Sequence, residues 1–273
     1  TAPYLLQKGR GGYRLGHDRI FDHMMLDGLE DAYEPGRSMG TFGEDCAAKY
    51  GFTRAEQDAF ATASVERAKA ATASGAFAAE ITPVTVKSRA GETVVSVDEG
   101  PGKVKLDKIA SLKPAFKKDG TITAASSSSI NDGAAALVMM RASTATKLGC
   151  KPLARIVGHA THAQEPEWFA TAPLGATQKA LAKAGWAVGD VDLWEINEAF
   201  AVVPMALMKE LNLPHDKVNV NGGACALGHP IGASGARIMV TLIYALQARG
   251  LKKGLATLCI GGGEATAVAV ELV

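Results

Sequence analysis

The spacing of apolar and polar positions changes twice along the chain. Residues 1 to about 45 show little periodicity and are rich in Gly, Arg and Asp, which predicts surface loops with short helices. The following stretch carries its apolar residues on one side of a helix. Thr53 and Glu56 have capping-box spacing at its start, and Gly75 stands where a helix would stop. We therefore predict a helix between Thr53 and Gly75.

The next stretch is typical of strands. Two β-like runs on either side of residues 89–91 predict a hairpin. Farther along, residues 134–140 form an unbroken apolar run. Such a run is typical of a strand that is buried on both faces, and we predict one here.

From Pro152 onward, strand-like and helix-like segments alternate. The predicted order is a strand at 153–162, a helix at 171–185, a strand at 190–197, a helix at 198–211 bent by Pro204, a helix at 235–250, and two strands in 255–273 joined by three glycines. This order indicates an α/β fold in which helices cover a mixed sheet. Loops at strand ends and helix starts often carry the chemistry in such folds, which draws attention to residues 197–200, 228–230 and 259–263.

Composition narrows the function classes. The 273 residues are 47% hydrophobic with a net charge of +1, which provides no general attraction to nucleic acid or to an anionic membrane. No apolar run reaches the roughly 18 residues of a membrane span. The four cysteines form no CxxC pair and no disulfide-framework spacing, so we expect a reducing, cytoplasmic compartment.

Several segments together resemble the thiolase family. They are SMGTFGEDCA, TRAEQDAFA, SINDGAAALV, PLARIV, INEAFA, GGACALGHPIGASGAR and LCIGGG. The resemblance implies a layered αβαβα fold of two similar halves with an inserted loop domain. On that basis residues 1–129 are expected to be loop domain, 130–150 a remnant of the N-terminal half, and 151–273 the C-terminal half. It also implies carbon–carbon bond formation or cleavage on acyl-CoA thioesters.

The resemblance assigns catalytic roles to four residues. It implies that His229 activates a nucleophilic thiol and presents its imidazole to the thioester oxygen, while Asn197 holds a water that is the second donor. Cys259 would move the α-proton, because a modest lowering of its pKa makes a thiolate accessible near neutral pH. The Gly261 N–H would belong to a second oxyanion hole. No cofactor or metal is expected, since coenzyme A is itself a substrate or product.

The resemblance also implies a substrate-binding wall. Its expected members are Ser128, Phe116, Met39, Phe169, Ala199 and Phe200. Ser126, Ser127 and Ser129 replace the family's Asn, Ala and Gly around Ser128. Phe169 replaces a frequent Met, and Ser38 replaces a frequent His. We expect these last two changes to favour short acyl chains.

Each of these residues also has a purely structural interpretation. His229 could cap a turn, Asn197 could be the N-cap of the next helix, and Cys259 could be a small buried apolar residue. Cys46, Cys150 and Cys225 keep the structural interpretation. The lysines between residues 103 and 118 could contact CoA phosphates, but they more often form a solvated face.

The Cys-Gly-Ser-Gly-like loop that carries the family's acylated cysteine has no counterpart in this sequence. We therefore expect the chain to be the C-terminal part of a thiolase, to require a separate N-terminal segment as partner, and to be inactive alone. The predicted function is acetyl-CoA C-acetyltransferase. A 3-ketoacyl-CoA thiolase for longer chains and a non-catalytic CoA-binding or assembly fragment are the alternatives. Residues 9–25 resemble the loop through which thiolases associate, so we expect a homodimer or homotetramer.

Overall fold

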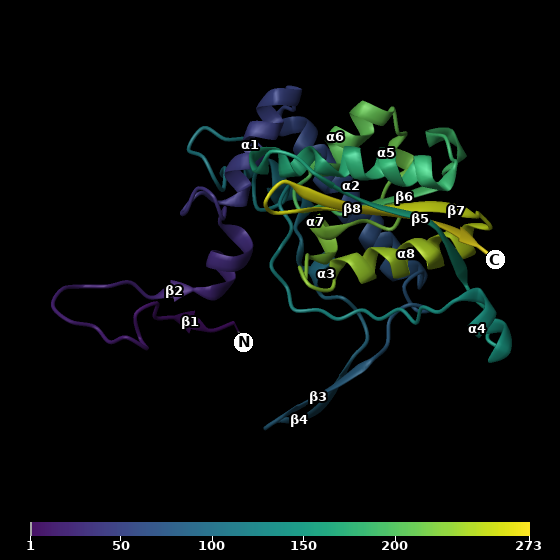
Figure 1. Cartoon of the computed structure of the whole chain (residues 1–273), viewed down its shortest axis with the longest axis horizontal. Coiled ribbons are helices and arrows are strands. Elements are labelled where there is room, and N and C mark those ends of the chain that lie inside the picture. Colours follow the sequence, from purple (N-terminus) through teal and green to yellow (C-terminus); the bar gives the residue numbers. More distant parts are fainter. Residues whose placement is uncertain (1) are drawn as a thin grey trace.

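A mixed four-stranded sheet forms the centre of the molecule (Figure 1). The structure is a computed structural model that describes residues 2–273. The strands are β5 (Ala154–Ala163), β6 (Leu193–Ile196), β7 (Lys253–Ile260) and β8 (Glu264–Leu272), in the order β5-β8-β7-β6. Strand β6 runs parallel to β7, whereas the β5–β8 and β7–β8 pairs are antiparallel. The predicted mixed sheet is confirmed, including the glycine turn between its last two strands.

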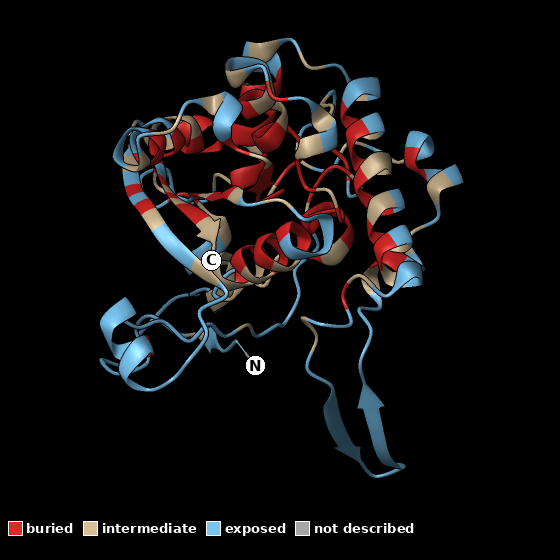
Figure 2. Cartoon of the chain, turned by 90° about the vertical axis from the view of Figure 1, so that its right-hand side faces the viewer, coloured by how far each residue is buried: buried red, intermediate tan, exposed pale blue. Residues whose placement is uncertain are grey.

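Helices cover both faces of this sheet. Helix α5 (Ala172–Ala184) lies on one face with α6 (Val202–Leu211) beside it, and α8 (Ser234–Arg249) lies on the other (Figure 1). Both α5 and α8 end at a glycine in the left-handed conformation, where a side chain would be strained. The helices turn their apolar residues to the sheet, and the buried residues concentrate there (Figure 2).

Two further helices pack beside the sheet layers. The predicted helix after Thr53 is confirmed as α2 (Arg54–Ser74), with both hydrogen bonds of the capping box and Gly75 at φ 75°. The preceding helix, α1 (Met39–Tyr50), lies partly in the region that we interpreted as loops. Gly40 and Gly43 obscure it in the sequence because glycine disfavours isolated helices. In the fold their missing side chains make room for Phe116 and Ile122.

Smaller elements surround this body. The predicted hairpin is confirmed as β3 (Val84–Ser88) and β4 (Gly91–Val95), which projects from the body and is exposed along its whole length (Figure 2). Strands β1 (Tyr4–Leu5) and β2 (Phe21–Asp22) form a separate arm. The remaining short helical segments are Met25–Leu29, α3 (Gly100–Lys103), Leu106–Ser111, α4 (Ala142–Lys147), Pro166–Thr171, Val188–Asp190, His215–Lys217 and α7 (Ala224–Leu227).

Two predicted elements were wrong. Residues 134–140 are extended but mostly exposed, and within residues 2–273 they belong to no sheet, so the apolar run is not a buried strand. Helix α6 begins at Val202 rather than near residue 198. Pro204 therefore lies in its first turn, where the missing N–H sacrifices no hydrogen bond, and it does not bend the helix interior.

Along the described part of the chain, the helices are either too short or too polar to span a bilayer.

Candidate functional site

The parallel pairing of β6 and β7 brings two of the predicted catalytic residues to one edge of the sheet. Asn197 directly follows β6, and its backbone N–H donates to the Thr257 carbonyl at 3.0 Å. Cys259 is the next-to-last residue of β7. Both side chains are buried. Because parallel strands end at the same edge, residues far apart in sequence become neighbours there.

His229 approaches this edge from the loop before α8. Its Nε2 lies 3.4 Å from Asn197 Nδ2, and its Nδ1 lies 2.5 Å from Ser234 Oγ. Ser234 Oγ also donates to the Pro230 carbonyl at 3.0 Å, so it accepts the Nδ1–H of the imidazole. The hydrogen bonds thus assign a tautomer in which the Nε2 lone pair faces Asn197. Ser234, which the sequence interpretation missed, holds the ring in this orientation.

The electrostatics favour a neutral imidazole. Burial, helped by the positive charge of Arg237, lowers the pKa of His229 to about 4, so the ring is an uncharged proton acceptor at neutral pH. Burial raises the pKa of Cys259 to about 12. This direction is opposite to the lowering that we expected. Its largest cause is burial, which removes water from the thiolate.

The side-chain oxygen of Asn197 is a hydrogen-bond acceptor in a buried site. Its Oδ1 is buried and has no hydrogen-bond partner among the described residues. The N-cap of α6 is Ala201, so the alternative in which Asn197 caps that helix is wrong. A buried amide oxygen without a partner favours a bound water or a substrate group in front of it.

A buried carboxylate fixes the loop that carries His229. The carboxylate of Glu198 accepts hydrogen bonds from Ser64 Oγ at 2.7 Å, Asn219 Nδ2 at 2.8 Å and the Cys225 N–H at 3.0 Å. A Cβ on Gly223 would lie only 2.3 Å from the Glu198 carboxyl carbon. A glycine is therefore needed here so that the loop can close over the carboxylate.

The serine-rich segment keeps its pairing despite the unusual residues. Both the backbone N–H and the hydroxyl of Ser128 donate to the Ala199 carbonyl, at 3.1 and 3.0 Å. The Ala201 N–H donates to the Ser126 carbonyl at 2.8 Å, and the His229 N–H donates to the Ser129 carbonyl at 3.0 Å. Ser126 and Ser129 thus tie the predicted CoA-contacting residue to both catalytic loops through main-chain bonds that do not depend on their side chains.

Aromatic side chains form one wall beside the glycine turn. The ring centroids of Phe116 and Phe169 lie 5.7 and 6.5 Å from that of Phe200. Phe42, which we did not predict, contacts Phe169 edge-on at 6.2 Å. Met39 Sδ is 3.5 Å from the position that a Cβ on Gly261 would occupy. The structure therefore brings Phe116, Phe169 and Phe200 together and places Met39 beside the predicted oxyanion glycine.

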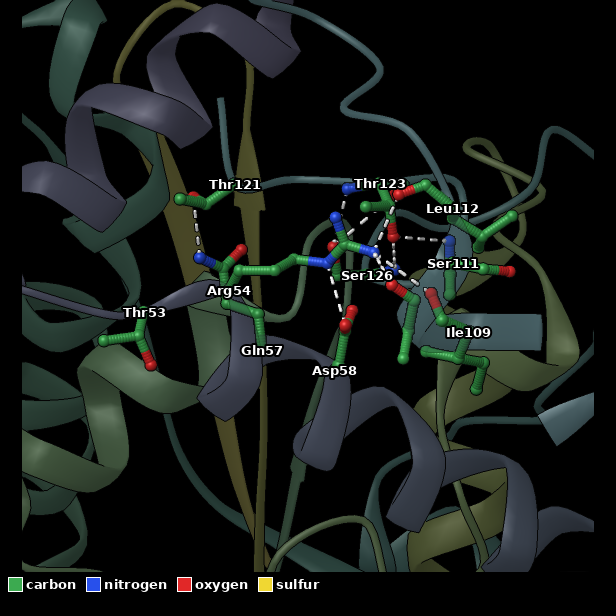
Figure 3. A network of polar contacts seen from close by, with 12 residues as sticks. Thr53, Arg54, Gln57, Asp58, Ile109, Ser111, Leu112, Thr121, Thr123 and Ser126 are labelled. Atoms are coloured by element: carbon green, nitrogen blue, oxygen red, sulfur yellow. Dashed lines mark hydrogen bonds and ion pairs between the residues drawn. The ribbon is translucent and has the colours of Figure 1, made fainter. Parts of the chain in front are cut away.

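Polar contacts from the start of α2 fasten the segment that carries Phe116 and the serines (Figure 3). Arg54 Nη2 donates to the carbonyls of Ile109 and Leu112 at 3.0 and 2.9 Å, while its Nε donates to Asp58. Gln57 donates to Thr121 Oγ1 at 2.8 Å. These bonds explain how a segment with little regular structure is held in place.

An open cavity of about 490 Å³ lies beside the His229 loop, between residues 131–135 and residues 230–233. Within residues 2–273, no three His, Cys, Asp or Glu side chains are grouped in a way that could bind a metal ion.

Comparisons with known proteins identify the family. Residues 1–143 match the family profile described as thiolase, N-terminal domain, and residues 150–272 match that described as thiolase, C-terminal domain. An acetyl-CoA acetyltransferase of Chromobacterium violaceum is 53% identical over 272 residues, which are 99% of this chain and 69% of that protein. One from Escherichia coli K12 is 52% identical, with the same two coverages.

Solved structures give the same result. The crystal structure of a Bacillus anthracis acetyl-CoA acetyltransferase superposes with a TM-score of 0.95 at 46% identity, covering 99% of this chain and 68% of that chain. A human mitochondrial 3-ketoacyl-CoA thiolase superposes with a TM-score of 0.91 at 37% identity, covering 100% and 69%.

Proposed function

This chain belongs to the thiolase family, and on that premise we propose that it carries the acid/base, oxyanion and CoA-binding parts of an acetyl-CoA acetyltransferase. The reaction would be the condensation of two acetyl-CoA molecules to acetoacetyl-CoA and CoA, or the reverse thiolysis. The observation that carries the proposal is the neutral His229 between Asn197 and Ser234, next to the strand end that bears Cys259.

In the first half-reaction, a nucleophilic cysteine loses its thiol proton to His229 Nε2 and attacks the thioester carbonyl. The carbon–sulfur bond to CoA breaks, and the CoA sulfur takes the thiol proton of Cys259. His229 keeps the proton on Nε2, and Cys259 is left as the thiolate. A lowered pKa suits His229 for this exchange because the ring returns readily to the neutral form. The acyl group is then held as a thioester on the enzyme.

In the second half-reaction, the Cys259 thiolate takes the α-proton of a second acetyl-CoA, and the resulting enolate carbon attacks the carbonyl of the acyl-enzyme. The carbon–sulfur bond to the enzyme cysteine then breaks, and that cysteine takes its proton back from His229 Nε2. The enolate oxygen would accept hydrogen bonds from a water on Asn197 and from His229 with its proton on Nε2. The ring that carries this second proton keeps its Nδ1–H bond to Ser234 Oγ. The Gly261 N–H would stabilise the oxyanion that forms on the acyl-enzyme.

We propose that the acylated cysteine lies outside these 273 residues. Burial raises the pKa of Cys46 to about 12 and that of Cys225 well above its ordinary value, which makes both poor nucleophiles. Cys150 follows α4, which lies apart from the sheet edge that carries the candidate site (Figure 1). The cavity between residues 131–135 and 230–233 is lined by Pro230, the residue after His229, and offers space for a segment that supplies the thiol.

Two further proposals concern the domain boundaries and the cellular compartment. We propose that residues 1–129 form the loop domain, 130–150 belong to the N-terminal half, and 151–273 form the C-terminal half. The four free cysteines fit a reducing compartment such as the cytoplasm.

The test is to express residues 1–273 alone and together with a separately supplied N-terminal thiolase segment. Loss of the acetoacetyl-CoA enolate absorbance on addition of CoA measures thiolysis. We expect activity only in the mixture, and its loss in the His229→Ala variant. Turnover by the chain alone would show that the nucleophile is one of its own cysteines, and an inactive mixture would contradict the acetyltransferase proposal.

A further inference from the structure

A line of hydrogen bonds runs from the surface of α5 to the predicted acyl pocket. Lys179 Nζ lies 3.0 Å from His162 Nδ1, and His162 Nε2 lies 3.2 Å from Gln164 Oε1. Gln164 Nε2 then donates to the Trp168 carbonyl at 2.6 Å and to Thr171 Oγ1 at 2.8 Å. None of these residues takes part in the proposed chemistry, so the line requires a different explanation.

The donors and acceptors in this line permit only one direction of hydrogen bonding, from Lys179 towards Trp168. A lysine ammonium has no acceptor, so His162 Nδ1 must accept and Nε2 must carry the proton. That proton is donated to Gln164 Oε1, which leaves both amide hydrogens of Gln164 for its two acceptors. Thr171 Oγ1 accepts one of these hydrogen bonds, and its own hydroxyl donates to the Trp168 carbonyl at 3.0 Å. Each hydrogen has a partner, so the Gln164 amide is held in one orientation.

Neighbouring residues leave space for the side chains of this hydrogen-bonded line. A Cβ on Gly175 would lie 2.4 Å from the His162 ring, so only a glycine in α5 lets the imidazole lie between Lys179 and Gln164. The Gln164 side chain holds the segment Pro166–Thr171, which carries Phe169 of the aromatic wall. The Gln164 backbone holds the opposite side, where its N–H donates to the Gly263 carbonyl at 2.9 Å.

Gly263 is in close contact with the same residue. It has φ 89°, and a Cβ there would lie 2.2 Å from the Gln164 carbonyl oxygen. The turn 261–263 therefore rests directly on the main chain of Gln164. A single residue links the predicted oxyanion turn to the predicted acyl-pocket wall.

We propose that Gln164, oriented by His162 and Lys179, is a positioning residue for the acyl-transfer reaction. It sets the distance between the Gly261 N–H and the Phe169 ring, and so determines how an acyl group lies against the oxyanion donor. The inference deepens the proposed function and depends on it for its kinetic consequence. Its structural part, the oriented line and its link to the glycine turn, can be measured without turnover.

The structural test uses NMR of the ¹⁵N-labelled chain. We expect the nitrogen shifts of His162 to report the tautomer with its proton on Nε2. Lys179→Met should disturb that signal and shift the Gly261–Gly263 amides. The matched control is Lys183→Met. Lys183 lies one turn farther along α5, is also exposed, and donates to the His159 carbonyl at 2.9 Å rather than to the line. A proton on Nδ1, or equal glycine shifts in both variants, would overturn the inference.

The kinetic test uses the chain combined with its N-terminal segment. Gln164→Glu keeps the size of the side chain but removes both donated hydrogen bonds. We expect kcat/KM to fall about tenfold, mostly in kcat, and the preference for four-carbon over ten-carbon 3-ketoacyl-CoA to weaken. Lys179→Arg, which keeps a donor, should retain most of the wild-type activity. Loss through thermal destabilisation with an unchanged chain-length ratio would overturn the positioning role.

The two tests separate the two proposals. If the wild-type mixture is inactive, the acetyltransferase proposal fails, whereas the NMR result still decides whether the line exists and reaches the glycine turn. If the mixture is active and Gln164→Glu behaves like wild type, only the positioning inference fails.

Discussion

His229 owes its chemistry to the residues around it. A histidine on an exposed turn would be partly protonated near its ordinary pKa of about 6.5. Here burial and Arg237 keep it neutral down to a pH of about 4, and Ser234 holds Nδ1. The proton acceptor is therefore available across the physiological range.

This environment predicts a pH-dependent stability. The folded pKa is below the unfolded one, so between pH 6.5 and about 4 the unfolded chain binds more protons at His229 than the folded chain does. The free energy of unfolding should fall as pH falls through this window, by about 2–3 kcal/mol for this residue. Urea unfolding at several pH values should show a shallower fall in His229→Gln than in wild type.

The matched control is His17→Gln, which removes a histidine at an exposed position. Parallel curves for wild type and His229→Gln would show that the buried imidazole does not contribute to acid sensitivity.

At the scale of elements, helix α1 shows how small residues create the aromatic wall. Gly40 has no side chain, and the Phe116 ring occupies the space where its Cβ would be, at 2.2 Å. Phe116 in turn contacts Phe200 edge-on. Because Gly40 has no Cβ, the Phe116 ring can pack directly against helix α1.

We expect Gly40→Ala to displace Phe116 and to cost about 1–3 kcal/mol of stability, as overpacking does. Binding of CoA, followed by calorimetry, should weaken together with stability. Gly102→Ala is the control because nothing lies within 4 Å of a Cβ at that exposed position. Wild-type CoA affinity in Gly40→Ala would mean that Phe116 lies outside the binding wall.

At the scale of the whole molecule, two apolar features are exposed. Residues 137–140 expose Leu, Val and two Met side chains. The β1–β2 arm exposes Tyr4, Leu6, Leu15 and Ile20, and Leu15 is fully exposed. Exposed apolar groups of this kind typically mark surfaces that associate with another chain.

We predict that the arm mediates association of the complete protein into at least a homodimer. Light scattering should give a mass of two or four subunits, and the double variant Leu15→Asp with Ile20→Asp should lower it. Val84→Asp with Val94→Asp, on the exposed hairpin β3–β4, tests whether any loss of exposed apolar surface has the same effect. A monomer for the wild-type protein would contradict the prediction, as would dissociation by the hairpin variant alone.

Local chemistry in the sequence was sufficient for the elements whose determinants lie within a few residues. The capping box at Thr53, the glycine ends of α2, α5 and α8, and the β3–β4 hairpin follow from short-range preferences. The order of strands and helices after Pro152 indicated the mixed sheet. The ordered set of segments identified the family, although spacing alone did not distinguish His229 from a turn residue.

Long-range contacts decided the rest. Helix α1 forms because Phe116 and Ile122, more than 70 positions away, fill the space above its glycines, and residues 134–140 are no strand because no described strand lies beside them. The tautomer of His229, the high pKa of Cys259 and the role of Gln164 depend on burial and on partners that only the folded chain supplies. A sequence pattern records what a residue can do, whereas desolvation and neighbouring donors, which act through space, determine which protonation state and orientation it adopts.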